Sequence, residues 1–196
     1  MPYLLPWLNG TDGVGIKRAD DEISFNFFVA GGGANGGALD HDDGSSFYHD
    51  HDNFFVYGGH KSDFDGHAKQ SYNNVLAFAN VYGSTCVGIG NAPHASPNPF
   101  FAEGFYNNTC ILAAAGDQYL GIGDCTADAT LANRVILGNN KIMSPGGSSA
   151  PVSCGKTYTF QDWIALGLDV GTTLSDVPPT PQIIQMARDL LSIPSA

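Results

Sequence analysis

The sequence predicts an all-β solenoid, a fold in which one structural unit winds repeatedly around a common core. Phe55, Phe78 and Phe101 recur at one equal interval of about 23 residues. A second apolar set, Val87, Ile111 and Val135, recurs at an interval of about 24 residues. A fixed period of this size is typical of stacked repeats, in which each turn buries its apolar residues against the next. We therefore expect coils of about 23 to 24 residues, with equivalent residues about 4.8 Å apart.

Composition and charge narrow the class of protein. Hydrophobic residues make up 43% of the 196 positions and charged residues 14%, and 25 glycines suit a β-rich fold with tight corners. The net charge is −11, which disfavours binding to nucleic-acid phosphates or to an anionic membrane. No apolar run approaches the length of about 18 residues that a membrane span needs. The sequence thus predicts neither a nucleic-acid partner nor a membrane span.

The chain divides into three segments. Residues 1–22 are expected to form an irregular segment or cap, and their Pro-interrupted opening lacks the basic start of a signal peptide. Residues 23–143 should form the coils, beginning with a strand over 23–30. Corner asparagines recur between the expected strands: Asn73-Asn74, Asn107-Asn108 and Asn139-Asn140. We expect a secreted chain that is mature or part of a longer protein.

Residues 144–196 are expected to close the solenoid with a loop and a helix. A Gly-, Ser- and Pro-rich stretch covers 144–157, and prolines at 178, 179 and 181 interrupt regular structure. Apolar residues then recur at helical spacing from Ile183 to Leu191. Thr180 is a suitable N-cap, with Pro181 at the first helical position. This amphipathic helix should pack on the coils as a cap or strap.

The four cysteines favour two disulfides. Cys86 and Cys110 are separated by the same interval as the members of the second apolar set, so adjacent coils would bring them within disulfide range. Cys125 and Cys154 then pair by elimination. The alternative is four reduced cysteines in a cytosolic protein. Asn9 and Asn107 each begin an N-glycosylation triplet, which with the disulfides indicates an extracellular protein.

The segments 53–59 (NFFVYGG) and 73–78 (NNVLAF) look like coils of a right-handed parallel β-helix. Together with the Asp-rich segment 39–46 (LDHDDGSS), they resemble the pectin-lyase-like superfamily, in particular eukaryotic β-helix domains. The resemblance covers residues 23–143, here the C-terminal coils of such a fold. It implies carbohydrate-active enzymes such as lyases, hydrolases and esterases, and also non-enzymatic adhesins.

An Asp- and His-rich segment between residues 40 and 69 is the candidate site. Asp40 and Asp63 are separated by the interval of the phenylalanine set, as are Asp42 and Asp65, so each pair should stack on neighbouring coils. Stacked carboxylates repel unless a cation such as Ca²⁺ neutralises them or one stays protonated. These four aspartates are therefore the predicted calcium ligands.

The resemblance adds catalytic roles to this segment. Lyases of the fold use a basic side chain, for which His67 and Lys69 are candidates, and its hydrolases use paired aspartates, here Asp42 and Asp65. The polygalacturonase motifs are absent, however, and the segment also fits a hydrophilic corner without catalysis. Six aromatic residues are further candidates for stacking on sugar rings if they face outward: Tyr48, Tyr57, Tyr72, Tyr82, Phe105 and Tyr106.

The sequence therefore predicts an extracellular carbohydrate-active β-helix protein that binds an acidic polysaccharide and cleaves it as a lyase or a glycoside hydrolase. The alternative is a non-catalytic structural or assembly module of a filament, a cell wall or a larger complex. It is favoured by the missing catalytic motifs and by the unprotected N-terminal end of the solenoid. Exposed strand edges there would support self-association or pairing with a partner chain.

Overall fold

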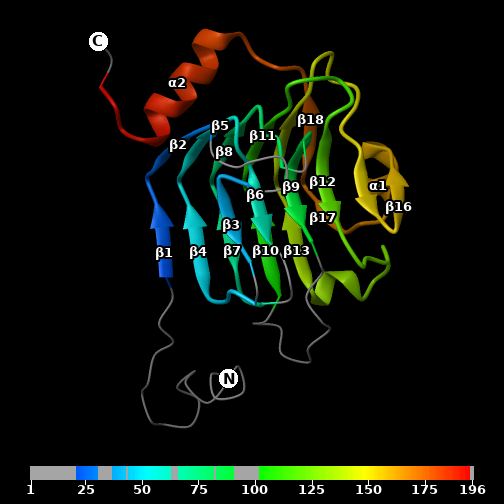
Figure 1. Ribbon diagram of the computed structural model, residues 1–196. Coiled ribbons are helices and arrows are strands. Elements are labelled where there is room, and N and C mark those ends of the chain that lie inside the picture. The colour runs from blue at the N-terminus through cyan, green and yellow to red at the C-terminus, as the bar shows by residue number, and fades with distance from the viewer. Residues whose placement is uncertain are drawn as a thin grey trace, which may run out of the picture.

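The computed structural model describes residues 21–30, 37–42, 44–62, 66–81, 83–90 and 102–194. Most of its regular structure is β-strand, arranged in three six-stranded sheets that surround a common interior (Figure 1). Two α-helices and one short 3₁₀ helix lie in the C-terminal part.

We name the sheets A, B and C. Sheet A contains β1 (Asp21–Ser24), β4 (Tyr48–His51), β7 (Gln70–Tyr72), β10 (Glu103–Tyr106), β13 (Val135–Gly138) and β17 (Asp169–Val170). Sheet B contains β2 (Phe27–Val29), β5 (Phe54–Val56), β8 (Val75–Ala77), β11 (Thr109–Ile111), β14 (Lys141–Met143) and β18 (Thr173–Ser175). Sheet C contains β3 (Leu39–His41), β6 (His60–Ser62), β9 (Thr85–Ile89), β12 (Gln118–Ile122), β15 (Val152–Cys154) and β16 (Lys156–Tyr158).

The chain visits the sheets in rotation, so the strands stack as a solenoid. β1, β2 and β3 belong to sheets A, B and C, and β4 returns to lie beside β1. Neighbouring strands pair in parallel throughout, except that β16 pairs antiparallel with β15. The expected all-β, parallel, solenoid-like arrangement is confirmed, and its strands continue as far as β18.

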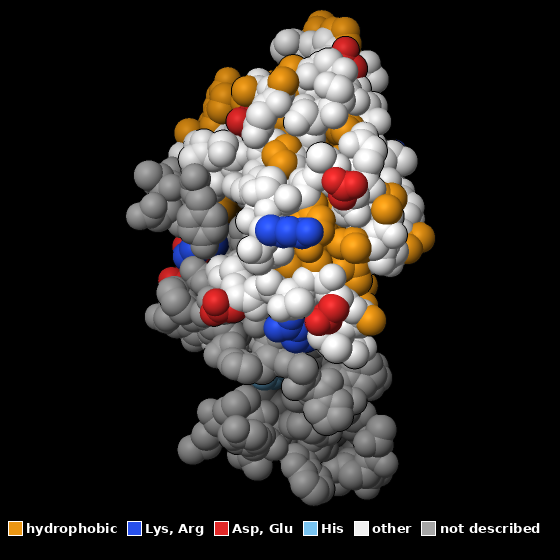
Figure 2. Space-filling view, turned by 90° about the vertical axis from the view of Figure 1, so that its right-hand side faces the viewer, with side chains coloured by type: hydrophobic (Ala, Val, Ile, Leu, Met, Phe, Trp, Pro, Cys, Tyr) orange, Lys and Arg blue, Asp and Glu red, His pale blue; other side chains and the backbone are white. Residues whose placement is uncertain are grey.

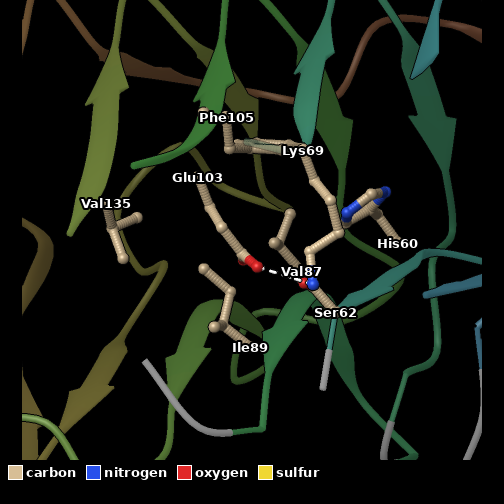
Figure 3. A pocket seen from close by; sticks show the side chains of 9 residues that line it. His60, Ser62, Lys69, Val87, Ile89, Glu103, Phe105 and Val135 are labelled. Carbon is tan, nitrogen blue, oxygen red and sulfur yellow. Dashed lines mark hydrogen bonds and ion pairs between the residues drawn. The ribbon is translucent and has the colours of Figure 1, made fainter. Parts of the chain in front are cut away.

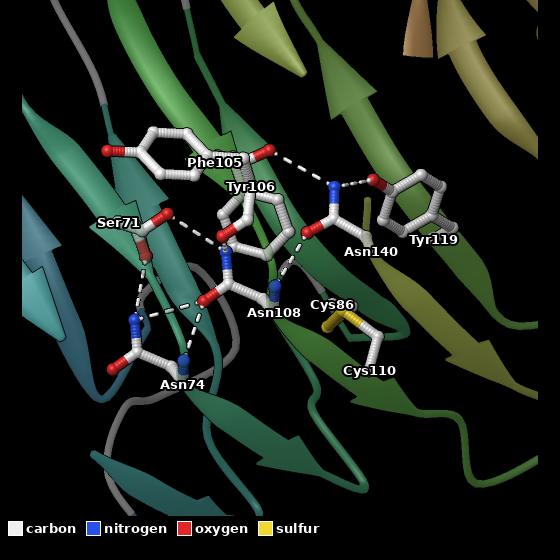
Figure 4. The surroundings of a disulfide bond; sticks show 9 residues. All are labelled: Ser71, Asn74, Cys86, Phe105, Tyr106, Asn108, Cys110, Tyr119 and Asn140. Carbon is white, nitrogen blue, oxygen red and sulfur yellow. Dashed lines mark hydrogen bonds between the residues drawn. A yellow bond between two sulfur atoms is a disulfide. The ribbon is translucent and has the colours of Figure 1, made fainter. Parts of the chain in front are cut away.

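An asparagine ladder fixes the corner between sheets A and B (Figure 4). Its members are Asn26, Asn53, Asn74, Asn108 and Asn140, completed by Thr172. Each backbone N–H donates to the side-chain oxygen of the next coil's member, over 2.8 to 3.0 Å. The residue before each member has a positive φ, as in Asn107 at +57°. The left-handed residue turns the chain, and the ladder satisfies buried amides that a turn would leave unpaired.

The expected constant period is wrong, as the steps along this ladder show. Asn26 and Asn53 are 27 residues apart, and Asn53 and Asn74 are 21 residues apart. The step from Asn74 to Asn108 is 34 residues. The last two steps, to Asn140 and then to Thr172, are each 32 residues. The coils therefore differ in length while their strands keep register.

The apolar residues that recur at equal intervals in the sequence do not stack on one another in neighbouring coils. Phe55 pairs with Leu76, so Phe78 is not its register partner, and Phe101 lies outside the described residues. Phe78 instead occupies a corner with φ +57° and stacks on Tyr57. Val87, Ile111 and Val135 lie on sheets C, B and A respectively, and all three are buried.

The helix α2 (Thr180–Leu190) covers the outer face of sheet B. Its Ile183 is buried against Phe54, Val75, Ala77 and Ile111. These outward side chains alternate with inward ones such as Leu76 and Cys110, which belong to the main core. The predicted C-terminal amphipathic helix is confirmed, and no helix in the described part of the chain is long and apolar enough to span a membrane.

The C-terminal end of the solenoid is closed by the helix α1 (Phe160–Ala165) and by β16. Trp163 of α1 is fully buried, and its Nε1 donates to Asp169 over 3.3 Å. The 3₁₀ helix η4 (Leu131–Asn133) leads into β13 and buries Leu131. Hydrophobic side chains gather on this end of the molecule between charged ones (Figure 2).

Both predicted disulfides are present. Cys86 and Cys110 have Cα atoms 6.2 Å apart, and Cys125 and Cys154 have Cα atoms 4.8 Å apart. The expected geometry of the first bond is wrong, because Cys86 lies on sheet C and Cys110 on sheet B. This disulfide therefore crosses the interior instead of joining stacked neighbours. The described cysteines are all disulfide-bonded, which is compatible with an extracellular protein.

Candidate functional site

The predicted Asp- and His-rich site is divided between the outside and the inside of the solenoid. Asp40 and Asp42 are on the outside, with side chains 36% and 45% exposed. The register partner of Asp40 is Lys61, whose Nζ lies 3.0 Å from Asp40 Oδ1 and 3.7 Å from Asp42 Oδ2. A lysine ammonium thus supplies positive charge at the place where the sequence predicts calcium.

The other members of the predicted calcium site, Asp63 and Asp65, lie outside the described residues. Within the described ranges, no group of three or more His, Cys, Asp or Glu side chains is placed to hold a metal ion. The calcium site therefore stays a prediction. Of the two predicted glycosylation sites, Asn107 is exposed at a corner, and Asn9 is outside the described residues.

His67 and Lys69 take different positions although they are close in sequence. His67 is partly buried, and its Nδ1 lies 3.5 Å from the Ser46 hydroxyl at the edge of sheet A. Between them, Ala68 has a positive φ of +57° and turns the chain. Lys69 then points into the solenoid, where its side chain is 2% exposed. The structure therefore does not bring Lys69 and Asp42 to one surface.

Lys69 is part of an interior polar cluster, which we define as His41, Asp50, His60, Ser62, Lys69 and Glu103. Its Nζ lies 2.6 Å from Glu103 Oε1 (Figure 3). The Ser62 hydroxyl donates to Glu103 Oε2 over 2.8 Å. Lys69 and Glu103 occupy neighbouring coils, because the residues that follow them, Gln70 and Gly104, are register partners.

The second half of the cluster is a chain of two histidines and one carboxylate. His41 Nε2 lies 2.6 Å from Asp50 Oδ2, and His60 Nδ1 lies 3.9 Å from the same oxygen. All three side chains point inward and are at least nine-tenths buried. Together with Ser62, Lys69 and Glu103, these three residues place charged and polar side chains among the apolar core residues of the first four coils.

Burial shifts the pKa values of Glu103 and His60 toward their neutral forms. Desolvation raises the pKa of Glu103, against the opposing effect of the Lys69 charge. Desolvation lowers the pKa of His60 from 6.5 to about 4, and Asp50 only partly offsets this effect. The cavity between His60, Ser62, Lys69 and Glu103 has room for about one water molecule. A polysaccharide chain is too large to reach these groups.

A surface of different chemistry lies on the outside of sheet A. The rings of His51 and Tyr72 stack with their centroids 4.8 Å apart and an interplanar angle of 8°. Tyr72 and Tyr106 continue the stack at 5.5 Å and 5°. We call these three residues the aromatic stack. It runs along β4, β7 and β10, and it ends at Tyr106 because the register partner on β13 is Gly138.

Acidic and apolar side chains contact His51 at one end of the aromatic stack. His51 Nδ1 lies 2.7 Å from Asp52 Oδ2, and His51 Nε2 lies 3.1 Å from Glu22 Oε1. Phe25 meets the His51 ring edge-on and is 62% exposed. Partial burial and the neighbouring Tyr106 raise the pKa of Tyr72, so its hydroxyl stays protonated at neutral pH. The surface therefore offers ring edges together with hydrogen-bond donors and acceptors.

Of the six aromatic residues singled out in the sequence, Tyr72 and Tyr106 face outward on sheet A. Phe105 is buried in the core, Tyr48 packs beside the buried His41, and Tyr82 is outside the described residues. The sequence places His51 in the acidic segment and not among aromatic residues. Its stacking on Tyr72 depends on the shortest coil, which is 21 residues long at the ladder step from Asn53 to Asn74. A constant period does not give this pairing.

No family model, curated protein or solved structure matches this chain.

Proposed function

We propose that this chain is a glycan-binding protein that takes a polysaccharide on the outer face of sheet A. The observation that carries the proposal is the aromatic stack of His51, Tyr72 and Tyr106, three rings from three successive coils. Solenoids form extended surfaces of this kind because equivalent residues fall in rows. A row of rings at coil spacing suits an extended polymer better than a compact ligand.

The chemistry of this face favours sugars. The outward edges of the three stacked rings offer rigid contact area for sugar rings at little cost in side-chain entropy. The carboxylates of Glu22 and Asp52 lie beside the stack and can accept hydrogen bonds from sugar hydroxyls. Tyr72 supplies a protonated hydroxyl to the same surface.

Charge indicates a neutral polysaccharide. The chain carries 19 acidic and 8 basic residues, and Glu22 and Asp52 add negative charge beside the stack. A uronate chain would be repelled from this face unless a divalent cation bridged the carboxylates. We therefore place neutral, hydroxyl-rich glycans ahead of the acidic glycans expected from the sequence.

The proposal is limited to binding. The candidate catalytic residues Asp42 and Lys69 lie on opposite sides of the sheet wall, the first exposed and the second buried. General acid–base catalysis needs both groups within reach of one glycosidic bond. The outward Asp40 and Asp42 are engaged with Lys61.

We also propose that the solenoid is a right-handed parallel β-helix of the pectin-lyase-like type and that the protein is extracellular. Supporting the fold assignment are the rotation of the chain through three parallel sheets and the asparagine ladder at one corner. Parallel strands of one sheet are almost always connected with a right-handed crossover. The two disulfides support the location.

The test is a glycan array probed with the chain and with the variant Tyr72→Ala/Tyr106→Ala. An aromatic contact contributes about 0.5 to 1.5 kcal/mol, so loss of two such contacts should weaken binding by about fivefold to 150-fold. Each array is probed with and without a chelator. Binding to neutral glycans should not change, whereas binding to acidic glycans that disappears with the chelator would indicate a cation-bridged site instead.

The matched control is Tyr57→Ala. Tyr57 is an equally prominent ring, 56% exposed, but it stacks on Phe78 at the end of β5 and away from the aromatic stack. This variant should bind as the unmodified chain does. Equal binding by the double variant, with its fold intact by circular dichroism, would remove the proposal.

A second candidate function is a structural module that assembles through its first coil. Phe27 and Val29 of β2 are each 57% exposed on the outer face of sheet B, next to the area that α2 covers. Exposed apolar side chains on an edge strand favour association with another chain. Sedimentation equilibrium should then show dimers or larger species that Phe27→Ser reduces to monomers. A monomer at every concentration would exclude this candidate.

A further inference from the structure

We propose that Lys69 and Glu103 condense into an intramolecular isopeptide bond that joins two neighbouring coils through the interior of the solenoid. Lys69 Nζ lies 2.6 Å from Glu103 Oε1, and the side chains are 2% and 5% exposed. The two residues precede register partners on β7 and β10, so the backbone holds their side chains side by side (Figure 3). The inference does not depend on the glycan-binding proposal.

Burial favours the neutral, protonated form of Glu103. Two charges buried without water carry a desolvation cost of several kcal/mol each. Desolvation also raises the pKa of Glu103, which favours the protonated carboxyl group. Transfer of a proton from the Lys69 ammonium to the Glu103 carboxylate leaves an amine beside a carboxylic acid, which is the pair that can form an amide.

The condensation is balanced without any other reactant. The lone pair of Lys69 Nζ attacks Glu103 Cδ, the bond between Cδ and Oε1 breaks, and Oε1 leaves as water after taking one proton from the nitrogen and keeping its own. Oε2 remains as the amide oxygen. The Ser62 hydroxyl already donates to Oε2 over 2.8 Å, so it is placed to stabilise negative charge on that atom during the attack. No oxidation or reduction takes place.

Position and confinement favour the linked product over hydrolysis. Groups held in a reactive geometry react as if at about 10⁵ to 10⁸ M, which exceeds the concentration of liquid water. The cavity beside the pair has room for about one water molecule, enough for the leaving group and too little for bulk solvent. His60 lines the same cavity, and its pKa of about 4 leaves a neutral imidazole as a proton acceptor at neutral pH.

The bond would add a third covalent link to the two disulfides. The Cys86–Cys110 disulfide crosses the interior between sheets C and B, and the Lys69–Glu103 link would join two neighbouring coils beside sheet A. Unlike the disulfides, it would resist reduction. Lys69 and Glu103 both belong to the interior polar cluster. The proposed bond would therefore explain why charged side chains are buried there.

Mass spectrometry of the intact chain tests the proposal. With both disulfides formed, the mass should be lower than that of the disulfide-bonded sequence by one water. Trypsin cleaves after lysine, so denatured and reduced protein should resist cleavage at Lys69 and give a peptide covering 62–134. Digestion of this peptide with chymotrypsin should then release a branched pair that contains Lys69 and Glu103.

The variant Lys69→Arg keeps the positive charge and lacks an amine that can condense. Its mass should therefore equal that calculated for its disulfide-bonded sequence, with no water lost. Asp–Gly pairs can also lose water by forming a succinimide, and the chain has such pairs at Asp12, Asp43 and Asp65. A mass deficit that maps to those pairs, or a wild-type chain of full mass that trypsin cleaves at Lys69, would overturn the proposal. Neither result depends on whether the variant folds.

Discussion

At the scale of single residues, burial controls the protonation of His60. Its ring lies inside the solenoid between His41 and Phe105, and desolvation holds its pKa at about 4. In the unfolded chain the imidazole returns to its ordinary pKa of 6.5. The neighbouring Asp50 favours the protonated ring, whereas His41 and Lys69 oppose it.

This difference predicts a loss of stability in mild acid. Well above pH 6.5 the ring is neutral in both states and contributes nothing to pH dependence. As pH falls from the unfolded pKa to the folded one, only the unfolded chain takes up the proton, so the free energy of unfolding should fall by about 3 kcal/mol. Urea unfolding at several pH values measures this slope.

The control is His60→Gln, which keeps a polar side chain and removes the titration. Asp169, whose pKa burial raises, favours the folded state at low pH in both proteins, so it does not contribute to the difference. The variant should lose less stability than the wild type between pH 6.5 and 4. Parallel curves over this range would show that His60 is not responsible.

At the scale of elements, the asparagine ladder connects the coils. Asn108 accepts from the backbone N–H of Asn74 over 2.8 Å, and its own amide donates to Ser71 and Tyr106 carbonyl oxygens. Its side chain is fully buried. Removing it would leave the Asn74 N–H and two carbonyl groups without these partners.

We therefore expect Asn108→Ala to lower the free energy of unfolding by about 2 to 3 kcal/mol. The matched variant is Asn107→Gly at the preceding position, which is exposed and has φ +57°, a conformation that glycine adopts without strain. It should change stability by less than about 0.5 kcal/mol. Equal losses from the two substitutions in thermal or urea unfolding would contradict the role given to the ladder.

The ladder also shows which elements the sequence could predict. The pairs Asn73-Asn74, Asn107-Asn108 and Asn139-Asn140 stand out because, at the corner between sheets A and B, a left-handed residue is followed by an inward amide. The amphipathic helix was predictable from spacing alone. Coil length was not, because extra residues between strands lie at corners, where they do not disturb strand pairing.

The apparent period of the second apolar set has a simple geometric origin. Val87, Ile111 and Val135 each lie two sheets further along the chain than the one before, on sheets C, B and A. Coils in this part of the chain are 32 or 34 residues long, so two of the three faces account for roughly the observed interval. The same relation joins Cys86 to Cys110, so the predicted pairing was correct and its stacked geometry was wrong.

At the scale of the whole molecule, the outer faces of the sheets and the interior carry side chains of different chemical types. The outer face of sheet B is covered by α2, the interior carries both an apolar core and a polar cluster, and the outer face of sheet A presents stacked rings. The predicted acidic site is split by this sorting, since alternate residues of one strand point to opposite sides of the wall. A one-residue difference therefore places His60 inside and Lys61 outside.

Footprinting by hydroxyl radicals, read by mass spectrometry with and without a neutral glycan selected on the array, tests the central claim most directly. Bound glycan should protect His51, Tyr72 and Tyr106 from oxidation and leave Tyr57 as reactive as in the free chain. Protection of Tyr57 and Phe78 with no change at the aromatic stack would contradict the account, because the ligand would then lie on a different face of the solenoid.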